Sequence, residues 1–437
     1  CDGGNGGGKI MLSTVFGSMF LSLVIGIPIA VCIGISCLAF IPWIPGGLDR
    51  VMFFVAQRMV VTADSFTLLA LPFFILAGTI MTTGGIAKQL TDMAEAIAGD
   101  FPGGLGIAAI VACCFFGAVS GSGPATVAAI GAVMLPAMLT RGYDVGYSGG
   151  LLACAGGIGV LIPPSVPMII YGVNSGASIT DLFVAGICPG ILVGLCLMIP
   201  TYTIARRKGY AGKPRGSDGK SALYHIWNAR AALFMPLIIL GGIYTGIFTP
   251  TEAGIVAVVY AIVLGTITGG LSFRGFCKAV VEAAVITGSC IFLMGTASAF
   301  ARLLHMRGVP DLIAKAVFSV TRNKYLILLM FNIVFLLGGM FIDTLSNILI
   351  FCPIFLPLAT QIGVDPTHFG IFIITNLALG MVTPPMGVDL FVAANICKCR
   401  FEKIMKGDIP FILINLVAVL LITYFPILSM WPLMLFR

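Results

Sequence analysis

The sequence predicts an all-α polytopic membrane protein that contains an inverted repeat, two re-entrant hairpins and two broken helices. Of its 437 residues, 59% are hydrophobic and 9% are charged, and the mean hydropathy is +1.10. Soluble domains are about 45–50% apolar and about 25% charged, so a soluble protein is excluded. The apolar runs are long and continuous, which excludes the short alternating segments of a β-barrel. The pattern of Gly and Pro in the first half also recurs in the second.

The chain divides into four regions. Residues 1–10 are rich in glycine, and we expect a flexible linker or a cloning remnant there. Residues 11–205 form the first repeat, and residues 231–437 form the second. Segment 206–230 between them gathers many Lys and Arg residues, so the positive-inside rule makes it a cytoplasmic loop. Because the basic residues gather in this loop, the net charge of +7 does not indicate a nucleic-acid partner.

Breaks at Gly, Pro and charged residues divide the repeats into segments. In the first repeat we expect a span at about 12–41, an amphipathic stretch at about 48–62, an apolar run at about 66–82, an amphipathic helix at about 86–99, two apolar halves at about 104–119 and 125–139, a broken run at about 146–174 and a span at about 185–205. Spans at about 231–247 and 252–269, an amphipathic piece near 273–285 and further runs to Phe436 follow.

An internal repeat is the most informative feature of the sequence. One constant shift, the repeat register, places residues of the first half on residues of the second without a gap. The matched positions include Gly117 and Gly338, Pro136 and Pro357, Asp144 and Asp365, Gly159 and Gly380, Pro163-Pro164 and Pro384-Pro385, and Asn174 and Asn395. If each repeat crosses the membrane an odd number of times, the second is inverted relative to the first. Transporters use such symmetry for alternating access around a site near the membrane midplane.

The segment Ser120-Gly121-Ser122-Gly123-Pro124 separates two short apolar runs and predicts the tip of a re-entrant hairpin. Pro124 suits the first turn of a helix, and Ser122 suits its N-cap. The free carbonyl groups of the arriving helix suit a cation, and the free N–H groups of the departing helix suit an anion. A span that is kinked at proline and packed through small residues is the alternative.

The second tip lies between Gly338 and Asn347. In the repeat register Asp343 matches Ser122, and Asn347 matches Thr126. A carboxylate inside a membrane is costly and therefore marks an ion or substrate path. A helix cap without a ligand is the alternative reading of Asp343.

Each repeat also contains a helix that is broken at a Pro-Pro pair. Two prolines free the carbonyl groups of the preceding turn, and lipid cannot satisfy them. A cage of neutral oxygens suits sodium, so a hairpin tip beside each break predicts two sodium sites, with an ordinary kink as the alternative. The expected ligands are Ser120, Gly121, Ser122, Gly157, Val160 and Pro163 at the first site, and Asp343, Thr344, Gly380, Val382 and Thr383 at the second.

Other polar motifs indicate helix caps. Thr249-Pro250-Thr251-Glu252 is typical of a capping box, and Asp144 and Asp365 are placed to open helices. The sequence has no His-Glu-x-x-His motif and no phosphate-binding Gly-x-x-x-x-Gly-Lys-Ser/Thr loop, so we expect no enzyme. An intramembrane hydrolase with Ser122 as nucleophile is a weak alternative, because no His or Lys partner lies nearby in the sequence.

Several motifs resemble the large membrane subunit of TRAP (tripartite ATP-independent periplasmic) transporters, over about residues 12–430. They are Leu161-Ile162-Pro163-Pro164-Ser165-Val166-Pro167, Thr249-Pro250-Thr251-Glu252-Ala253, Asp64-Ser65-Phe66, the two hairpin tips and Thr383-Pro384-Pro385. The resemblance implies a sodium-driven elevator of the ion-transporter superfamily type in the bacterial inner membrane. It also implies a small four-helix membrane subunit and a periplasmic binding protein. This protein would deliver a small organic anion such as a C4-dicarboxylate, sialic acid or a sulfonate.

The resemblance places Ser122, Ser165 and Asp343 at or beside the substrate and sodium positions. The full set of expected substrate contacts is Ser122, Thr126, Ser165, Asn174, Asp343 and Asp389. Asp389 departs from the family pattern, in which we expect a neutral residue. We expect it near the second tip, where it tightens a sodium site, binds a hydroxyl or amino group of the substrate, or reaches an aqueous vestibule without a role. A sodium-coupled dicarboxylate or anion carrier without partners is the alternative to a TRAP subunit.

Overall fold

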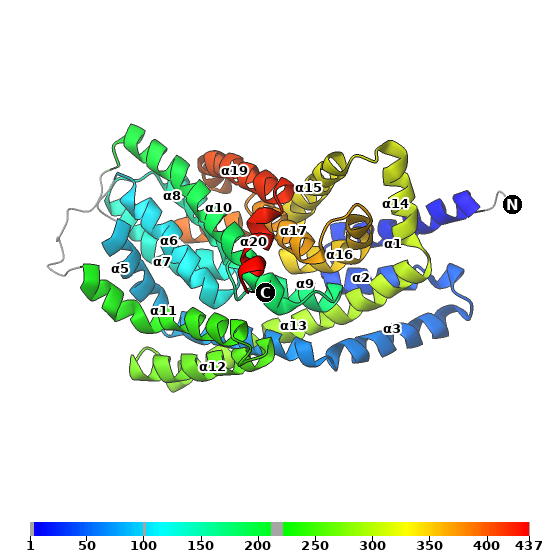
Figure 1. Ribbon diagram of the computed structural model, residues 1–437, viewed down its shortest axis with the longest axis horizontal. Coiled ribbons are helices and arrows are strands. Elements are labelled where there is room, and N and C mark those ends of the chain that lie inside the picture. The colour runs from blue at the N-terminus through cyan, green and yellow to red at the C-terminus, as the bar shows by residue number, and fades with distance from the viewer. Residues whose placement is uncertain (1–3, 99–101, 211–221, 437) are drawn as a thin grey trace.

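The computed structural model describes residues 4–98, 102–210 and 222–436, and Figure 1 shows an assembly of helices. These residues form α-helices and short 3-10 helices and no strand. Nine of the described helices are long and apolar enough to cross a membrane. The predicted all-α polytopic fold is therefore confirmed.

The helices follow one another with short connections. Those of the first half are α1 (Gly4–Val24), α2 (Ile29–Leu38), η1 (Ile41–Trp43), α3 (Gly47–Ala63), η2 (Phe66–Leu69), α4 (Ala70–Thr83), α5 (Ile86–Ala98), α6 (Gly104–Ser120), α7 (Gly123–Thr140), α8 (Val145–Gly157), η3 (Ile158–Val160), α9 (Val166–Ser175) and α10 (Ile179–Lys208). Those of the second half are α11 (Ala222–Tyr244), α12 (Pro250–Ile267), α13 (Phe273–Met306), α14 (Val309–Val320), α15 (Lys324–Phe341), α16 (Thr344–Gln361), α17 (Pro366–Gly380), α18 (Val388–Cys397), α19 (Phe401–Tyr424) and α20 (Ile427–Phe436).

The helix boundaries repeat with the same shift as the sequence. Helices α2, α7 and α8 begin at Ile29, Gly123 and Val145, and α12, α16 and α17 begin at the matching positions Pro250, Thr344 and Pro366. The repeat therefore extends beyond the Gly and Pro pattern to the first helices of each half. One difference is that α13 is continuous for 34 residues where the first half is divided into α3, η2 and α4.

Three segments differ from the sequence-based boundaries. Residues 4–10, expected as a linker, belong to α1, because the helix that the apolar run nucleates continues into them despite the low helix propensity of their glycines. The expected span 12–41 is two helices, because Gly26 has a φ of +88° and Pro28 precedes α2. In the basic segment 206–230, both ends are helical. Residues 1–3 of the linker and 211–221 of this loop lie outside the described residues.

The two halves exchange their packing partners. Helix α9 packs against α16 of the second hairpin, while α18 packs against α7 of the first. Helix α8 packs closely on α19, since a Cβ added at Gly150 would lie 2.7 Å from the Cα of Asp408. Each hairpin is thus held by a helix from the other repeat.

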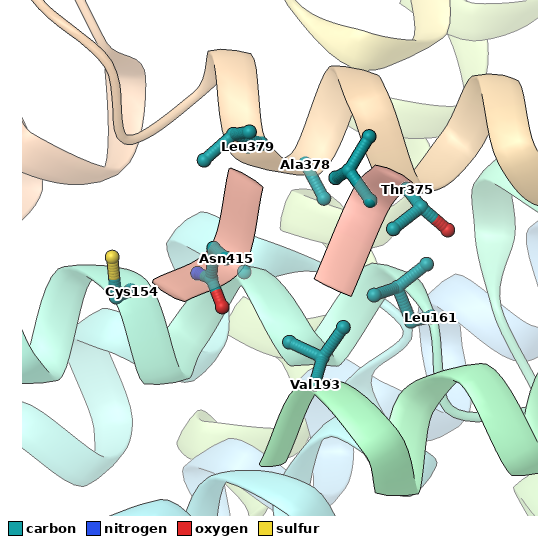
Figure 2. Close-up of a pocket in the computed structure, with 9 residues that line it drawn as sticks. Cys154, Leu161, Val193, Thr375, Ala378, Leu379 and Asn415 are labelled. Carbon is teal, nitrogen blue, oxygen red and sulfur yellow. The ribbon is translucent and has the colours of Figure 1, made fainter. Parts of the chain in front are cut away.

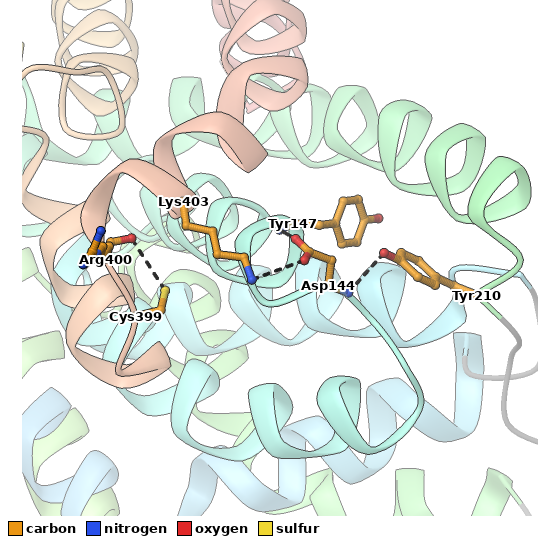
Figure 3. Close-up of polar contacts among 6 residues, drawn as sticks. All are labelled: Asp144, Tyr147, Tyr210, Cys399, Arg400 and Lys403. Atoms are coloured by element: carbon orange, nitrogen blue, oxygen red, sulfur yellow. Dashed lines mark hydrogen bonds and ion pairs between the residues drawn. The ribbon is translucent and has the colours of Figure 1, made fainter.

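The start of α8 is also tied to α19 (Figure 3). Asp144 caps α8 by accepting from the N–H of Tyr147 at 3.0 Å, and its carboxylate pairs with the ammonium group of Lys403 at 3.6 Å. The N–H of Asp144 donates to the hydroxyl of Tyr210, at the end of α10, at 3.1 Å. The predicted cap at Asp144 is confirmed, as are the cap at Asp365 and the Glu252 capping box.

Candidate functional site

The first hairpin consists of α6 and α7, and its tip rests directly on the break between α8 and α9. A Cβ added at Gly117 would lie 2.6 Å from the Cα of Gly159, so these two backbones touch. At the tip, Gly121 has a φ of +60°, and a Cβ there would lie 3.1 Å from the carbonyl oxygen of Pro164. Only glycine fits this turn, because both the backbone conformation and the close contact exclude a side chain.

Neutral oxygens gather at this first tip. The hydroxyls of Ser120 and Thr126 lie 2.9 Å apart, and the hydroxyl of Thr126 donates to the carbonyl of Ser122 at 2.7 Å. Across the contact, the hydroxyl of Ser165 donates to the carbonyl of Val160 at 2.6 Å. The structure therefore brings the predicted residues Ser120, Ser122, Thr126, Val160 and Ser165 to the same hairpin–break contact.

Two further residues expected at the first sodium site, Pro163 and Gly157, lie in the break and on the side of α8 that faces away from the tip. Pro163 lies in the non-helical segment 161–165 between η3 and α9. Gly157 faces the second broken helix instead of the tip, since a Cβ there would lie 3.5 Å from the carbonyl oxygen of Ala378.

The second hairpin consists of α15 and α16, and Asp343 caps α16 at its tip. The carboxylate accepts from the N–H groups of Leu345 and Ser346 at 3.0 and 3.2 Å, and from the hydroxyl of Ser346. The capping role of Asp343 is therefore present in the structure. The side-chain oxygen of Asn347 is buried and has no hydrogen-bond partner, whereas the side-chain NH₂ group of Asn347 donates to the carbonyl of Ile342 at 2.8 Å.

The second break repeats the close contact of the first. A Cβ added at Gly380 would lie 2.5 Å from the Cα of Gly339, so α15 and the end of α17 touch through their backbones. The hydroxyl of Thr344 donates to the sulfur of Met381 at 2.8 Å. Val382 and Thr383 form the turn after α17, where the hydroxyl of Thr383 donates to the carbonyl of Leu379 at 2.6 Å and the N–H of Val382 to the same carbonyl at 3.2 Å.

One backbone hydrogen bond joins each tip to its break. The N–H of Val166 donates to the carbonyl of Gly121 at 3.4 Å, and the N–H of Gly387 donates to the carbonyl of Met340 at 3.3 Å. Val166 and Gly387 are matched positions in the repeat register. A hairpin tip that rests on the break of a neighbouring helix, which we call a tip–break unit, therefore occurs in both repeats.

Two expected substrate contacts lie elsewhere than the sequence suggested. Asn174 is nine residues after Ser165 along α9, about 14 Å away at the rise of an α-helix, so the structure separates it from the tip. Asp389, on α18, points at the first hairpin, whereas we expected it beside Asp343 at the second. A Cβ added at Gly123 would lie 2.8 Å from an oxygen of Asp389. The reason is the exchanged packing of α18 against α7.

The family model for the DctM component of tripartite ATP-independent periplasmic transporters matches residues 16–428. The chain belongs to this TRAP transporter family. It is 44% identical over 421 residues to the isethionate TRAP transporter permease protein DctMQ of Oleidesulfovibrio alaskensis, covering 96% of this chain and 66% of that one. It is 40% identical to the C4-dicarboxylate large permease protein DctM of Pseudomonas aeruginosa, over 86% of this chain and 88% of the relative. A sialic acid large permease protein, SiaM of Vibrio cholerae, is 34% identical over 95% and 96% of the two chains.

A solved structure supports the fold of this TRAP permease. The Alcanivorax borkumensis YdaH transporter, described as having an unusual topology, matches with a TM-score of 0.65 and 15% identity over 89% of this chain and 90% of the other. The family consists of transporter permeases and not of enzymes, so the serine hydrolase alternative is wrong. The resemblance noted in the sequence is confirmed.

Asp408 of this TRAP permease is a buried acidic residue that the sequence reasoning missed. It is fully buried on α19, one oxygen accepts from the thiol of Cys154 at 3.0 Å, and the other has no partner. A signal was present, because Asp408 and Asn415 are seven residues apart and share one face of an apolar helix. Cys154 and Asn415 line a cavity of about 10 Å³ between the broken helices (Figure 2). That volume holds at most one water, so it is not the substrate site.

Proposed function

We propose that this chain is the large membrane subunit of a sodium-coupled importer of a small organic anion. The observation that carries the proposal is the tip–break unit, which occurs in both repeats and whose hydrogen-bond donors, Val166 and Gly387, are matched positions. Discontinuous helices of this kind give secondary transporters their substrate and ion sites, with helix ends aimed at the charged ligands. The relatives named above are permeases for isethionate, C4-dicarboxylates and sialic acid, all of them small organic anions.

Sodium is the proposed coupling ion, with one site at each tip. At the first tip the available groups are neutral hydroxyl and carbonyl oxygens of Ser120, Ser122 and Val160. At the second tip Asp343 supplies a carboxylate, and Thr344, Gly380, Val382 and Thr383 surround the break. These oxygens are the hard donors that an alkali cation prefers, and two matched sites give two sodium ions per cycle.

The substrate is proposed to lie between the two tips, at Ser122, Thr126, Ser165, Asp343 and Asp389. A rigid movement of both tip–break units against the surrounding helices would carry the site across the membrane as an elevator. A small four-helix membrane subunit would enlarge the surrounding scaffold, and a periplasmic binding protein would deliver the substrate. The proposed location of this complex is the bacterial inner membrane.

Sodium-driven uptake into proteoliposomes tests the proposal. The chain is reconstituted with its small subunit, the binding protein is added outside, and uptake of a labelled substrate anion is measured with an inward sodium gradient. We expect no uptake when potassium replaces sodium, and equal uptake in both would refute the coupling. Omitting the binding protein separates the two carrier types, because a stand-alone carrier would keep its full rate.

A further inference from the structure

Asp389 is a buried carboxylate that has no partner. Its side chain is 0% exposed, and neither of its oxygens accepts a hydrogen bond. An unsatisfied buried acceptor destabilises the fold, and a charged one does so more strongly. A hydrogen-bond donor on a bound ligand would satisfy this group.

The carboxylate of Asp389 is aimed at the first hairpin tip. A Cβ added at Gly123 would lie 2.8 and 3.2 Å from its two oxygens, and Gly123 is the first residue of the 18-residue helix α7. Ser122, an expected substrate contact, is the N-cap of that helix. No N–H group of α7 donates to Asp389, so both oxygens are left for the hydrogen-bond donor of a ligand.

A second carboxyl group lies near this position. Asp408 on α19 is also fully buried, and among the residues that the structure describes neither carboxylate pairs with Lys or Arg. A second ionised carboxylate on a substrate would therefore find no Lys or Arg partner here, and an unpaired charge in a membrane interior is costly.

The carboxylate exists in only one of the two repeats. The matching residue is Met168 on α9, which is fully buried and packs against Gly186 of α10. Asp343 also occurs in one repeat alone, since its match is Ser122, so the repeat supplies neither carboxylate twice. The surroundings of Asp389 therefore have no matched counterpart beside the second tip, which suits a substrate whose two ends differ.

We propose that Asp389 is a specificity-determining residue that accepts a hydrogen bond from a hydroxyl group of the substrate. The preferred substrate then has one acidic group and one hydroxyl, and dicarboxylates are rejected. This inference rests on the proposed function and adds the substrate class. A site that hydrogen-bonds a hydroxyl discriminates strongly against an analogue that lacks it, because the buried acceptor is then left unpaired.

Four ligands that differ in the group at one end test the inference. Their binding is measured on the membrane complex, without the binding protein. The ligands are isethionate with a hydroxyl, propanesulfonate with a methyl, taurine with an ammonium group, and succinate with a second carboxylate. The measurement is the rise of the thermal unfolding midpoint with ligand concentration, which gives the affinity. We expect isethionate to bind at least about tenfold more tightly than propanesulfonate and succinate.

Two variants separate the charge from the hydrogen bond. Asp389→Asn keeps an acceptor oxygen, so we expect it to retain the preference for isethionate over propanesulfonate and to gain succinate binding. Asp389→Leu removes the acceptor, so that preference is expected to disappear. Asp144→Asn at the exposed start of α8 is the control, and its ligand profile is expected to match that of the wild type.

Four results of the binding measurements would overturn the inference. They are equal binding of isethionate and propanesulfonate by the wild type, tighter binding of taurine, an unchanged preference in Asp389→Leu, and a sodium-induced midpoint rise that Asp389→Asn alone removes. The wild-type series decides the question even if a variant fails to insert. Sodium-driven uptake that prefers succinate would refute this inference and leave the proposed function intact.

Discussion

Replacing Gly380 with alanine tests whether the second tip and its break work as one unit. The added Cβ would lie 2.5 Å from the Cα of Gly339 and 2.6 Å from its carbonyl carbon. Non-bonded carbon atoms are best placed about 3.5–4.0 Å apart, so α15 and α17 must separate by about 1 Å. Both obstructing atoms belong to the backbone, and no side chain can rotate away to relieve the contact.

The expected cost follows from this displacement. Overpacking of a buried contact typically costs about 1–3 kcal/mol, which should lower the thermal unfolding midpoint. The same shift moves Thr383 away from Asp343 at the proposed sodium site. A displacement of about 1 Å at a site that requires strict geometry can reduce a rate by about 100-fold, so we expect uptake to fall at least tenfold.

The assay compares the initial uptake rate per reconstituted protein with the unfolding midpoint of the same preparation. Gly288→Ala on α13 is the matched control, because no atom lies within 4 Å of its added Cβ. Replacing glycine inside a helix is expected to raise the stability of that control by about 0.5–1 kcal/mol and to leave uptake unchanged. If Gly380→Ala behaves like Gly288→Ala in both measurements, the reasoning from the backbone contact is refuted.

Three further predictions concern polar groups. Asp343→Ala should abolish uptake and remove a helix cap that contributes about 1 kcal/mol to stability. Asp343→Asn should restore the thermal unfolding midpoint but not uptake. Uptake at the wild-type rate in the Asn variant would exclude a role for the charge. Lys403→Ala should cost less than about 1 kcal/mol, because its pair with Asp144 is half exposed. Although partial burial raises the pKa of Asp144, backbone N–H groups and Lys403 together hold it below its usual value. Its stabilisation should therefore be complete above about pH 3.9 and be lost as the pH falls through the folded-state pKa, which unfolding midpoints at several pH values would show. Ser429→Ala removes the hydroxyl that lies 2.7 Å from a ring nitrogen of His368. The free energy of unfolding should fall by about 1–3 kcal/mol. An unchanged thermal unfolding midpoint would contradict this prediction.

The features that the sequence predicted well have local causes. The tip at Ser120-Gly121-Ser122 and the breaks at the two Pro-Pro pairs follow from residues that cannot continue a helix. The caps at Asp144 and Asp365 also depend only on groups within one turn. Because the sequence repeats, the tip found in the first half also indicated where the tip of the second half lies, although the second tip has fewer helix-breaking residues.

The features that the sequence did not predict depend on packing between segments far apart. Nothing local to Asp389 indicates that α18 packs against α7 of the other repeat, so its carboxylate was expected at the wrong hairpin. Asn174 matches its counterpart Asn395 in the repeat, but its place at the far end of α9 removes it from the tip. Asp408 shares a helix face with Asn415, but it follows charged residues at the start of α19, and its burial depends on the packing of α8 against that face.

The exchange of α9 and α18 between the repeats has a consequence for assembly. A first repeat on its own would have α7 without the helix that covers it, and its own α9 would lack α16 as a partner. A chain divided between the repeats could satisfy these contacts only if its two pieces associated, as the subunits of a domain-swapped dimer do. Neither half is therefore a separate packing unit, and the tertiary packing of the first repeat is completed only after the second has been synthesised.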